Sequence, residues 1–139
     1  MHRKTLIALI GAIVIAVAAT GAALAASAGP AVNVQIKTLT RTLKNVVVHG
    51  ETGWITKGGT PKGVCSGKSG AGALDAATHG KWGGTYFSSL KDIEVTSILG
   101  VKPKKPYFWL IYVNGKMAST GVCGIKLHAG EKILFKVHK

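Results

Sequence analysis

The sequence predicts an α+β fold: a single small domain of about five strands and one helix, following an N-terminal signal segment. Three observations support this prediction. The chain opens with an uncharged apolar leader, and the remaining residues, about 110 of them, suffice for one core. Short runs with the period-two alternation of half-buried strands are spread along this remainder. Only one stretch, Ala71 to His79, has the composition of a helix.

The leader has the layout of a secretory signal. A positively charged start precedes an apolar run, and Ala23-Leu24-Ala25 places small residues before a cleavage point. We therefore expect residues 1–25 to be a signal peptide and the domain to occupy 30–139, in a secreted or cell-envelope protein. The exported chain should begin at Ala26, or at Gly29 if the second small-residue site is used. An uncleaved anchor is the alternative, because the uncharged run of about 20 residues could span a bilayer.

The charge is strongly basic, with 18 Lys and Arg against 5 Asp and Glu. Two of the basic residues, Arg3 and Lys4, lie in the leader, so 16 minus 5 leaves +11 on the domain. Such a charge favours anionic partners such as envelope polymers or lipid head groups, or it keeps a secreted domain in solution. We expect no nucleic acid partner, because the chain is exported and has no nucleic-acid-binding motif. Membrane contact is expected only through an uncleaved leader.

The two cysteines, Cys65 and Cys123, predict a disulfide, because paired thiols are the default outside the cytoplasm. Their separation of 58 residues corresponds to about 4 kcal/mol of chain-entropy stabilisation. Two free buried thiols are the alternative.

Two strands are predicted at the start of the domain. Val32 to Lys37 alternates apolar and polar residues, and Leu43 to His49 is rich in β-branched residues. A hairpin between them is expected. The glycine-rich stretch from Glu51 to Gly70 is too broken for regular structure, and a loop this long in a small domain is usually functional or mobile.

The segment Gly63 to Gly72, GVCSGKSGAG, resembles a phosphate-binding loop but fails its spacing. Lys62 stands where the first glycine of G-x-x-x-x-G-K-[ST] is required, and no buried strand precedes the segment. The glycines and serines instead predict a loop that turns into the helix Ala71 to His79. Ser66 or Ser69 can cap the start of this helix, and Gly80 is placed to end it.

Three further strands are predicted in the second half of the chain. Ile93 to Ile98 is the first. After a proline-containing loop, Tyr107 to Val113 is apolar on both faces, as expected of a central strand covered on both sides or of a strand that exposes an aromatic face to a ligand. Asn114-Gly115 then predicts a tight hairpin. Ile133, Phe135 and Val137 alternate with polar residues in a closing strand.

Four segments in this order resemble the transcobalamin C-terminal-like domain family, found in many secreted bacterial proteins of unknown function. They are AGALDAATHGKW (71–82), DIEVTSILG (92–100), YFWLIYVNGK (107–116) and GVCGIKLHAGEKILFKV (121–137). The resemblance covers essentially the whole domain and implies a β-grasp-like mixed sheet with one helix packed on it. Glu131 replaces the usual Asp of the family's "GD" turn, and Cys123 stands where an aromatic-rich segment often begins.

The resemblance also bears on cobalamin. In vitamin B12 carriers the related domain closes over one side of the corrinoid, and a separate helical barrel supplies the other side. This sequence contains no such barrel, so cobalamin binding does not carry over from the resemblance alone. A role as a cobalamin-binding accessory domain needs a second domain.

Sequence patterns for catalysis or metal binding are absent. The histidines His49, His79, His128 and His138 are too far apart for the short spacings of metal sites. No nucleophile motif of a known hydrolase class is present. We therefore expect no enzyme activity, no metal and no cofactor.

The aromatic residues are the better indication of function. Trp109 and Tyr112 fall on opposite faces of their strand, and Trp54 lies among lysines in the glycine-rich loop. With Asn114 of the hairpin they form the predicted ligand-binding site: Trp54, Trp109, Tyr112 and Asn114. Alternatively, Trp54 folds back as a lid over the core.

Two functions remain open. The first is an exported, non-catalytic binding module of the cell envelope, with a small planar or anionic molecule or a glycan as ligand. The second is a structural or adhesive envelope protein that acts through its basic surface.

Overall fold

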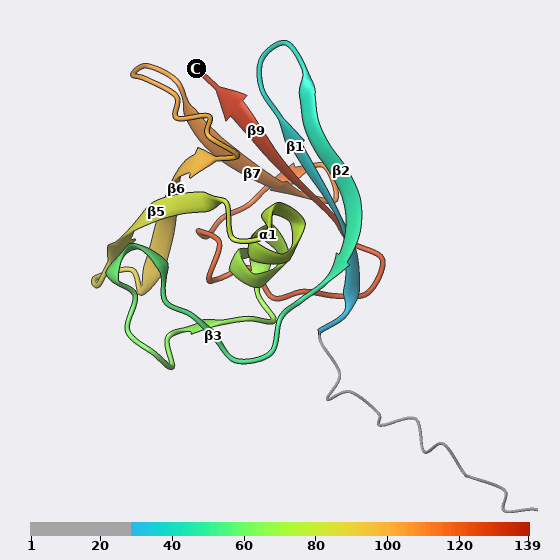
Figure 1. Cartoon of the computed structure of the whole chain (residues 1–139). Helices are drawn as coiled ribbons and strands as arrows, with labels where there is room; N and C mark the ends of the chain where they lie inside the picture. The colour runs from blue at the N-terminus through green and yellow to red at the C-terminus, as the bar shows by residue number, and fades with distance from the viewer. Residues whose placement is uncertain (1–28) are drawn as a thin grey trace, which may run out of the picture.

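A computed structural model describes residues 29–139, and the predicted signal peptide, residues 1–25, lies outside the described residues (Figure 1). The domain has one α-helix, one short 3-10 helix and nine strands. The longer strands are β1 (Ala31–Lys37), β2 (Thr42–His49), β5 (Trp82–Phe87), β6 (Asp92–Ile98), β7 (Phe108–Val113) and β9 (Lys132–His138). The two-residue strands are β3 (Trp54–Ile55), β4 (Cys65–Ser66) and β8 (Lys116–Met117), and the helices are η1 (Lys57–Gly59) and α1 (Gly70–Thr78).

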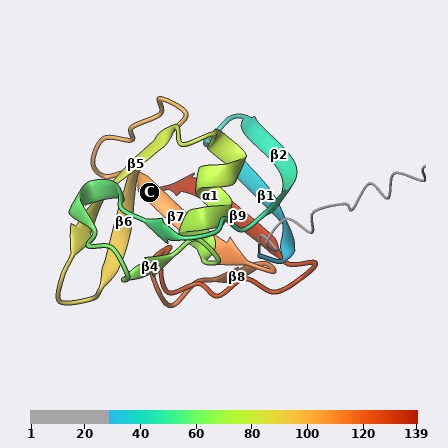
Figure 2. The same ribbon diagram turned by 60° about the horizontal axis from the view of Figure 1, so that its bottom comes forward.

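The main sheet has five strands in the order β2-β1-β9-β7-β8. Its pairs are antiparallel except for β1 and β9, which run parallel, so the sheet is mixed as predicted. The predicted hairpin between the first two strands is confirmed, with Val34 opposite Val46. The domain is therefore α+β, with the one α-helix of the described residues lying across the sheet (Figure 2).

The closing strand β9, and not the aromatic strand β7, is central to this sheet. β9 pairs along its length with β1 on one side and β7 on the other. β7 has a second neighbour only at Tyr112 and Val113, where it pairs with β8. The prediction that Tyr107 to Val113 forms a central strand is confirmed in part: β7 is an inner strand between β9 and β8, but β8 pairs with only its last two residues.

One face of the sheet carries the core. Alternate residues along β1, β9 and β7 point to this face, and their buried members are Val32, Val34, Ile36, Ile133, Phe135, Val137 and Trp109. The helix covers this face with Ala71, Ala73, Leu74 and Ala77. This alternation is the reason that the sequence pattern located the strands correctly.

The helix α1 begins and ends close to its predicted bounds. Ser69 is the N-cap, and its side-chain oxygen accepts a hydrogen bond from the backbone N–H of Ala71. At the other end His79 adopts the left-handed conformation, with φ 51°, and Gly80 follows with φ 77°. The helix is therefore ended by His79 together with Gly80, and not by Gly80 alone.

Gly72, in the first turn of α1, allows a close approach of the chain. A Cβ atom at this position would overlap the carbonyl of Gly67 in the preceding loop. The glycines of the GVCSGKSGAG segment thus serve packing between the loop and the helix.

The glycine-rich stretch contains more regular structure than predicted. β3 and β4 pair with each other, with Trp54 opposite Ser66, and the short helix η1 lies between them. The expectation that residues 51–70 are too broken for regular structure is therefore wrong. Both strands are two residues long, which is below the length at which period-two alternation can be recognised.

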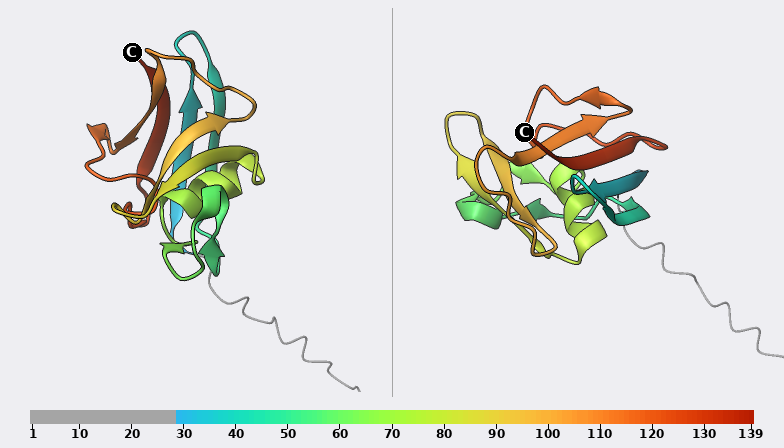
Figure 3. Two further views of the ribbon diagram at one scale, coloured as in Figure 1. Left: turned by 90° about the vertical axis from the view of Figure 1, so that its left-hand side faces the viewer. Right: turned by 90° about the horizontal axis from the view of Figure 1, so that it is seen from above.

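One of the longer strands, β5, was not predicted from the sequence. β5 pairs with β6 in a separate antiparallel ribbon, with Tyr86 opposite Ile93. The sequence of β5, WGGTYF, carries two consecutive glycines that weaken the strand pattern, and the register shifts at Gly83 and Gly84. Figure 3 shows this ribbon beside the main sheet, at the edge formed by β7 and away from β2.

The predicted disulfide between Cys65 and Cys123 is confirmed, with a Cα–Cα distance of 5.0 Å. It joins β4, just before α1, to the segment between β8 and β9. Residues 118–121 of this segment contribute to the cleft described next. Among the described residues, no helix is long and apolar enough to cross a bilayer.

Candidate functional site

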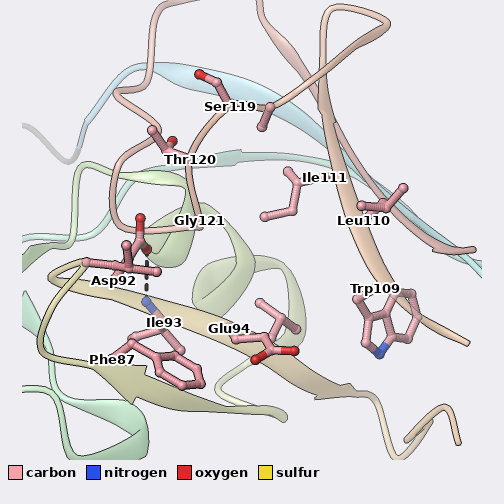
Figure 4. Close-up of a pocket in the computed structure, with 13 residues that line it drawn as sticks. Phe87, Asp92, Ile93, Glu94, Trp109, Leu110, Ile111, Ser119, Thr120 and Gly121 are labelled. Carbon is pink, nitrogen blue, oxygen red and sulfur yellow. Dashed lines mark hydrogen bonds between the residues drawn. The ribbon is translucent and has the colours of Figure 1, made fainter. Parts of the chain in front are cut away.

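A cleft of about 550 Å³ separates the β5–β6 ribbon from the main sheet (Figure 4). Its lining comes from the end of β5 and its turn, from β6, from β7, and from the segment that follows β8. The lining residues are Phe87, Leu90, Asp92, Ile93, Glu94, Val95, Trp109, Leu110, Ile111, Ala118, Ser119, Thr120 and Gly121. Most of these side chains are apolar, as is typical of small-molecule sites.

The cleft exists because two strand edges face each other without pairing. The strand that pairs with β6 is β5, and β7 is paired with β9 on its other side. On the cleft side of β7, Ile111 accepts a hydrogen bond from the backbone of Ala118, at 2.8 Å, where the β7–β8 hairpin ends. Further along β7, at Trp109, neither β6 nor β8 pairs with the strand. The space between these two strand edges is therefore lined by side chains and is not closed by backbone hydrogen bonds.

Two carboxylates line the β6 wall. Asp92 is half-buried, and one of its oxygens, Oδ1, accepts hydrogen bonds from the backbone N–H of Ile93 at 2.9 Å and of Cys123 at 2.8 Å. Glu94 is exposed two residues further along the same strand. Asp92 therefore acts as a link between β6 and the segment before β9, while Glu94 is available to a ligand.

The positions of the two carboxylates do not match those needed for paired acid catalysis. Both carboxylates come from one strand and so lie on one wall of the cleft, whereas paired acid catalysis needs carboxyl groups on either side of the reacting bond. Ser119 and Thr120, on the opposite side of Figure 4, are exposed, and neither takes part in a hydrogen bond to a histidine or an acid in the described residues. The polar groups of the cleft can orient a ligand through hydrogen bonds.

The four residues of the predicted site are not brought together. Trp109 lines the cleft, with only 7% of its surface exposed, and its Nε1 donates to the carbonyl of Val101 at 3.4 Å. Tyr112 is half-buried on the opposite face of β7. Asn114 lies in the β7–β8 turn, with φ 50°, and its side-chain oxygen accepts from the backbone of Lys132 at 2.9 Å. Trp109 alone of the four is part of the cleft.

Trp54 lies elsewhere, on the small β3–β4 ribbon. It is 46% exposed and is not among the residues that line the cleft. Its neighbour in the chain, Ile55, is the residue of β3 that enters the core.

Sequence reasoning missed the two apolar side chains at the rim of the cleft. Phe87 ends β5 and is 42% exposed, and Leu90 in the following turn is 74% exposed. The signal that could have found them is the run Thr85-Tyr86-Phe87, an aromatic strand end followed by a polar turn.

A second polar cluster lies where the glycine-rich stretch meets α1. Trp82 is buried and donates from Nε1 to the carboxylate of Asp75 at 2.7 Å. Lys57 lies 3.8 Å from the same carboxylate and 5.3 Å from the centre of the Trp82 ring, and it donates to the carbonyl of Gly80 at 2.7 Å. This cluster ties η1 to the end of the helix.

Glu51 belongs to the same cluster and has a perturbed acidity. Burial raises the pKa of Glu51 to about 7, assisted by the negative charge of Asp75 and by a hydrogen bond to Asp75 that the protonated acid can make. The positive charge of Lys57 lowers the pKa of Glu51 and so opposes these effects. Glu51 lies with Asp75 in the cluster that ties η1 to the end of the helix and does not line the cleft, so its position is structural.

No group of three His, Cys, Asp or Glu residues in 29–139 is arranged to hold a metal ion. His128 pairs with Glu131, at 3.2 Å between Nδ1 and Oε1, and this contact closes the turn before β9.

Comparisons with known proteins extend this description. Residues 73–139 match a family model described as a domain of unknown function (DUF4430). No curated protein matches the sequence.

Two solved structures share the fold. One is a protein of Ruminococcus gnavus ATCC 29149 described as a presumed metal-binding protein, with a TM-score of 0.56 and 12% identity, over 79% of this chain and 97% of that one. The other is haptocorrin in complex with Cbi, with a TM-score of 0.54 and 17% identity, over 79% of this chain.

The match covers 25% of the haptocorrin chain, so this chain corresponds to about a quarter of that protein. At these identities the two structures show a shared fold and no more. The likeness to haptocorrin supports, at the level of the fold, the resemblance to transcobalamin C-terminal-like domains.

Proposed function

We propose that this chain is an exported, non-catalytic binding module of the cell envelope, and that its ligand site is the cleft between β6 and β7. The observation that carries this proposal is the cleft itself: about 550 Å³ with a mostly apolar lining and a few polar groups. The confirmed disulfide supports export, because such bonds persist outside the cytoplasm.

The chemistry of the lining residues limits the kinds of ligand that can bind in the cleft. Trp109 and Phe87 offer aromatic surface on two walls of the cleft, which suits a flat molecule with an apolar body. Glu94 and Asp92 place negative charge on the β6 wall, so a small neutral or cationic molecule fits better than an anion. We therefore propose a small planar ligand, with a glycan as the alternative because sugars also combine aromatic contact with acidic hydrogen-bond acceptors.

The two solved relatives are compatible with a binding role. Haptocorrin is described in complex with Cbi and the Ruminococcus gnavus protein as a presumed metal-binding protein. For this chain we propose no cobalamin binding without a second domain, and corrinoids enter only as probes in the experiment below.

The experiment titrates the chain, processed at its leader, with a neutral planar dye such as Nile red, a cationic planar dye such as thioflavin T, and cobinamide. The rim variants Phe87→Ser and Leu90→Ser remove apolar contact without touching the core. Each should weaken dye binding about tenfold, which corresponds to the loss of part of one buried apolar side chain. Val47→Ser, at an exposed valine of β2 that does not line the cleft, is the matched control.

Trp54, a predicted site residue that lies outside the cleft, provides the outcome that would contradict the proposal. If Trp54→Ala weakens binding and the rim variants do not, the ligand binds at the glycine-rich loop and the cleft is not the site. Binding that is abolished by moderate salt, yet insensitive to the rim variants, would instead favour an adhesive role for the basic surface.

A further inference from the structure

Three segments that are distant in the sequence meet at one end of the main sheet. β1 and β9 run parallel, with Lys37 beside Lys136, so the β1–β2 turn lies next to the end of β9. β7 runs antiparallel to β9, with Phe108 opposite His138, which brings the segment between β6 and β7 to the same end. In Figure 1 this end is at the top, where the turn, the loop and the C-terminus converge. We call it the basic end.

The basic end gathers half of the positive charge of the domain. Of the 16 Lys and Arg in residues 29–139, which are 18 less Arg3 and Lys4, eight belong to these three segments. They are Lys37, Arg41, Lys44, Lys102, Lys104, Lys105, Lys136 and Lys139. None of the five acidic side chains is in these segments, and none of the eight makes an ion pair within the described part of the chain. Glu94 is the acid that shares a hollow with Lys102 and Lys105.

Exposed apolar side chains lie among these charges. Leu39 at the tip of the β1–β2 turn is 58% exposed, and Phe108 at the start of β7 is 45% exposed. A shallow hollow of about 310 Å³ joins the turn to the opposite loop, and its apolar lining is Leu39, Val101, Pro103, Tyr107 and Val137. The basic end therefore combines dense positive charge with a projecting apolar tip.

We propose that the basic end binds the surface of a bilayer that contains anionic lipid, with Leu39 and the neighbouring aromatic residues entering the head-group region. Uncompensated lysines near a negatively charged leaflet each add to attraction. Apolar side chains that project beyond the charges gain by entering the boundary between head groups and acyl chains, whereas an extended anionic polymer in water offers them nothing comparable. This combination favours a lipid surface over a soluble polyanion.

This inference is independent of the cleft. The basic end and the cleft have no lining residue in common, because the hollow is formed by the β1–β2 turn and the loop before β7. The sequence predicted membrane contact only through an uncleaved leader. The present proposal goes beyond that expectation, because the fold brings three segments that carry three, three and two basic residues to one end of the sheet.

The test measures sedimentation with vesicles of phosphatidylcholine, with and without an equal part of phosphatidylglycerol. The protein is the chain beginning at Ala26, whose sheet, helix, core and disulfide all lie within 29–139. We expect binding only to the phosphatidylglycerol vesicles. The triple variant of Lys102, Lys104 and Lys105 to Gln should lower partitioning about 100-fold, because each basic residue near the surface contributes about 1 kcal/mol.

A matched control separates a local surface from net charge. Changing Lys62, Lys68 and Lys126 to Gln removes the same charge from exposed positions outside the basic end, and partitioning should fall by only a few-fold. Circular dichroism verifies that both triple variants are folded. Equal losses for the two triple variants would overturn a localised basic end.

A second pair of variants tests the choice of a bilayer. Leu39→Ser should lower partitioning about fivefold, because it removes the apolar tip, whereas Val47→Ser, at an exposed valine of β2, should leave it unchanged. If Leu39→Ser binds the vesicles as well as the wild type, and soluble polyphosphate binds the wild type as tightly as the vesicles do, the partner is an anionic polymer and the bilayer proposal is wrong.

Discussion

The raised pKa of Glu51 predicts that the domain loses stability as the pH rises to neutrality. The perturbation is Glu51→Gln, which keeps the size and hydrogen-bonding capacity of the side chain but removes its charge. Glu51 faces Asp75, whose carboxylate is also bound by Trp82 and lies near Lys57. In the wild type, ionisation of Glu51 places a second negative charge beside Asp75.

The sign of the effect follows from the direction of the pKa change. The folded state holds the proton of Glu51 up to about pH 7, whereas an unfolded chain releases it near the ordinary value of 4.5. The stabilisation from this proton is therefore complete below about pH 4.5 and is lost as the pH rises through about 7. The wild type should be less stable at about pH 8 than at about pH 4 by this contribution.

The pKa values of Glu51 in the folded and unfolded states set an upper limit on the change in the free energy of unfolding. A rise from 4.5 to about 7 corresponds to at most about 3 kcal/mol. Glu51 is only partly buried, so solvent screening reduces the expected difference to about 1–2 kcal/mol. At about pH 8 the free energy of unfolding of Glu51→Gln should exceed that of the wild type by this amount, and at about pH 4 the two should agree.

The assay is urea unfolding with the disulfide intact, followed by tryptophan fluorescence at the two pH values. Glu94→Gln, which removes an exposed acid of β6 outside this cluster, is the matched control. A difference between Glu51→Gln and the wild type that is the same at both pH values would refute the reasoning, because it would show that the charge of Glu51 is not the cause.

Three further predictions concern the packing around the helix and the cleft. Cys65→Ser should lower the free energy of unfolding by about 4 kcal/mol, the chain-entropy value for a bridge to Cys123 across 58 residues, and thiol labelling of the unreduced, unfolded wild type should find no free cysteine. Gly72→Ala should destabilise by about 1–3 kcal/mol despite the higher helix propensity of alanine, because the new Cβ overlaps the preceding loop; a stabilised variant in thermal unfolding would contradict this. Asp92→Ala removes two hydrogen bonds to backbone N–H groups and should cost about 2–4 kcal/mol, measured by urea unfolding, whereas Glu94→Ala should change stability by less than about 0.5 kcal/mol.

Much of the local structure followed from the sequence. The strand alternation in 32–37 and 133–137 located the core face correctly, because side chains of a strand alternate regardless of its partners. A serine cap at Ser66 or Ser69 was predicted for the helix start, and Ser69 is the N-cap, since capping depends on residues two or three positions away. The disulfide followed from the presence of only two cysteines in a chain that was predicted to be exported.

The candidate site was accessible from the sequence only in part. Trp109 was identified, because aromatic residues in a strand stand out. Phe87 and Leu90 were not, because β5 contains two adjacent glycines and its partner strand β6 supplies the pairing that makes it a strand. The separation of Trp54 from Trp109 could not be predicted either, since it depends on where the β3–β4 ribbon packs.

The sequence by itself determined five of the six longer strands, the helix and its start, and which cysteines pair, because these depend on neighbouring residues or on a single available partner. Only the tertiary structure decided that β9 is central, that β6 and β7 leave a cleft between unpaired edges, and that eight basic residues meet at one end. Strand order is set by packing between segments up to about a hundred residues apart, such as β1 and β9, and no local pattern encodes it.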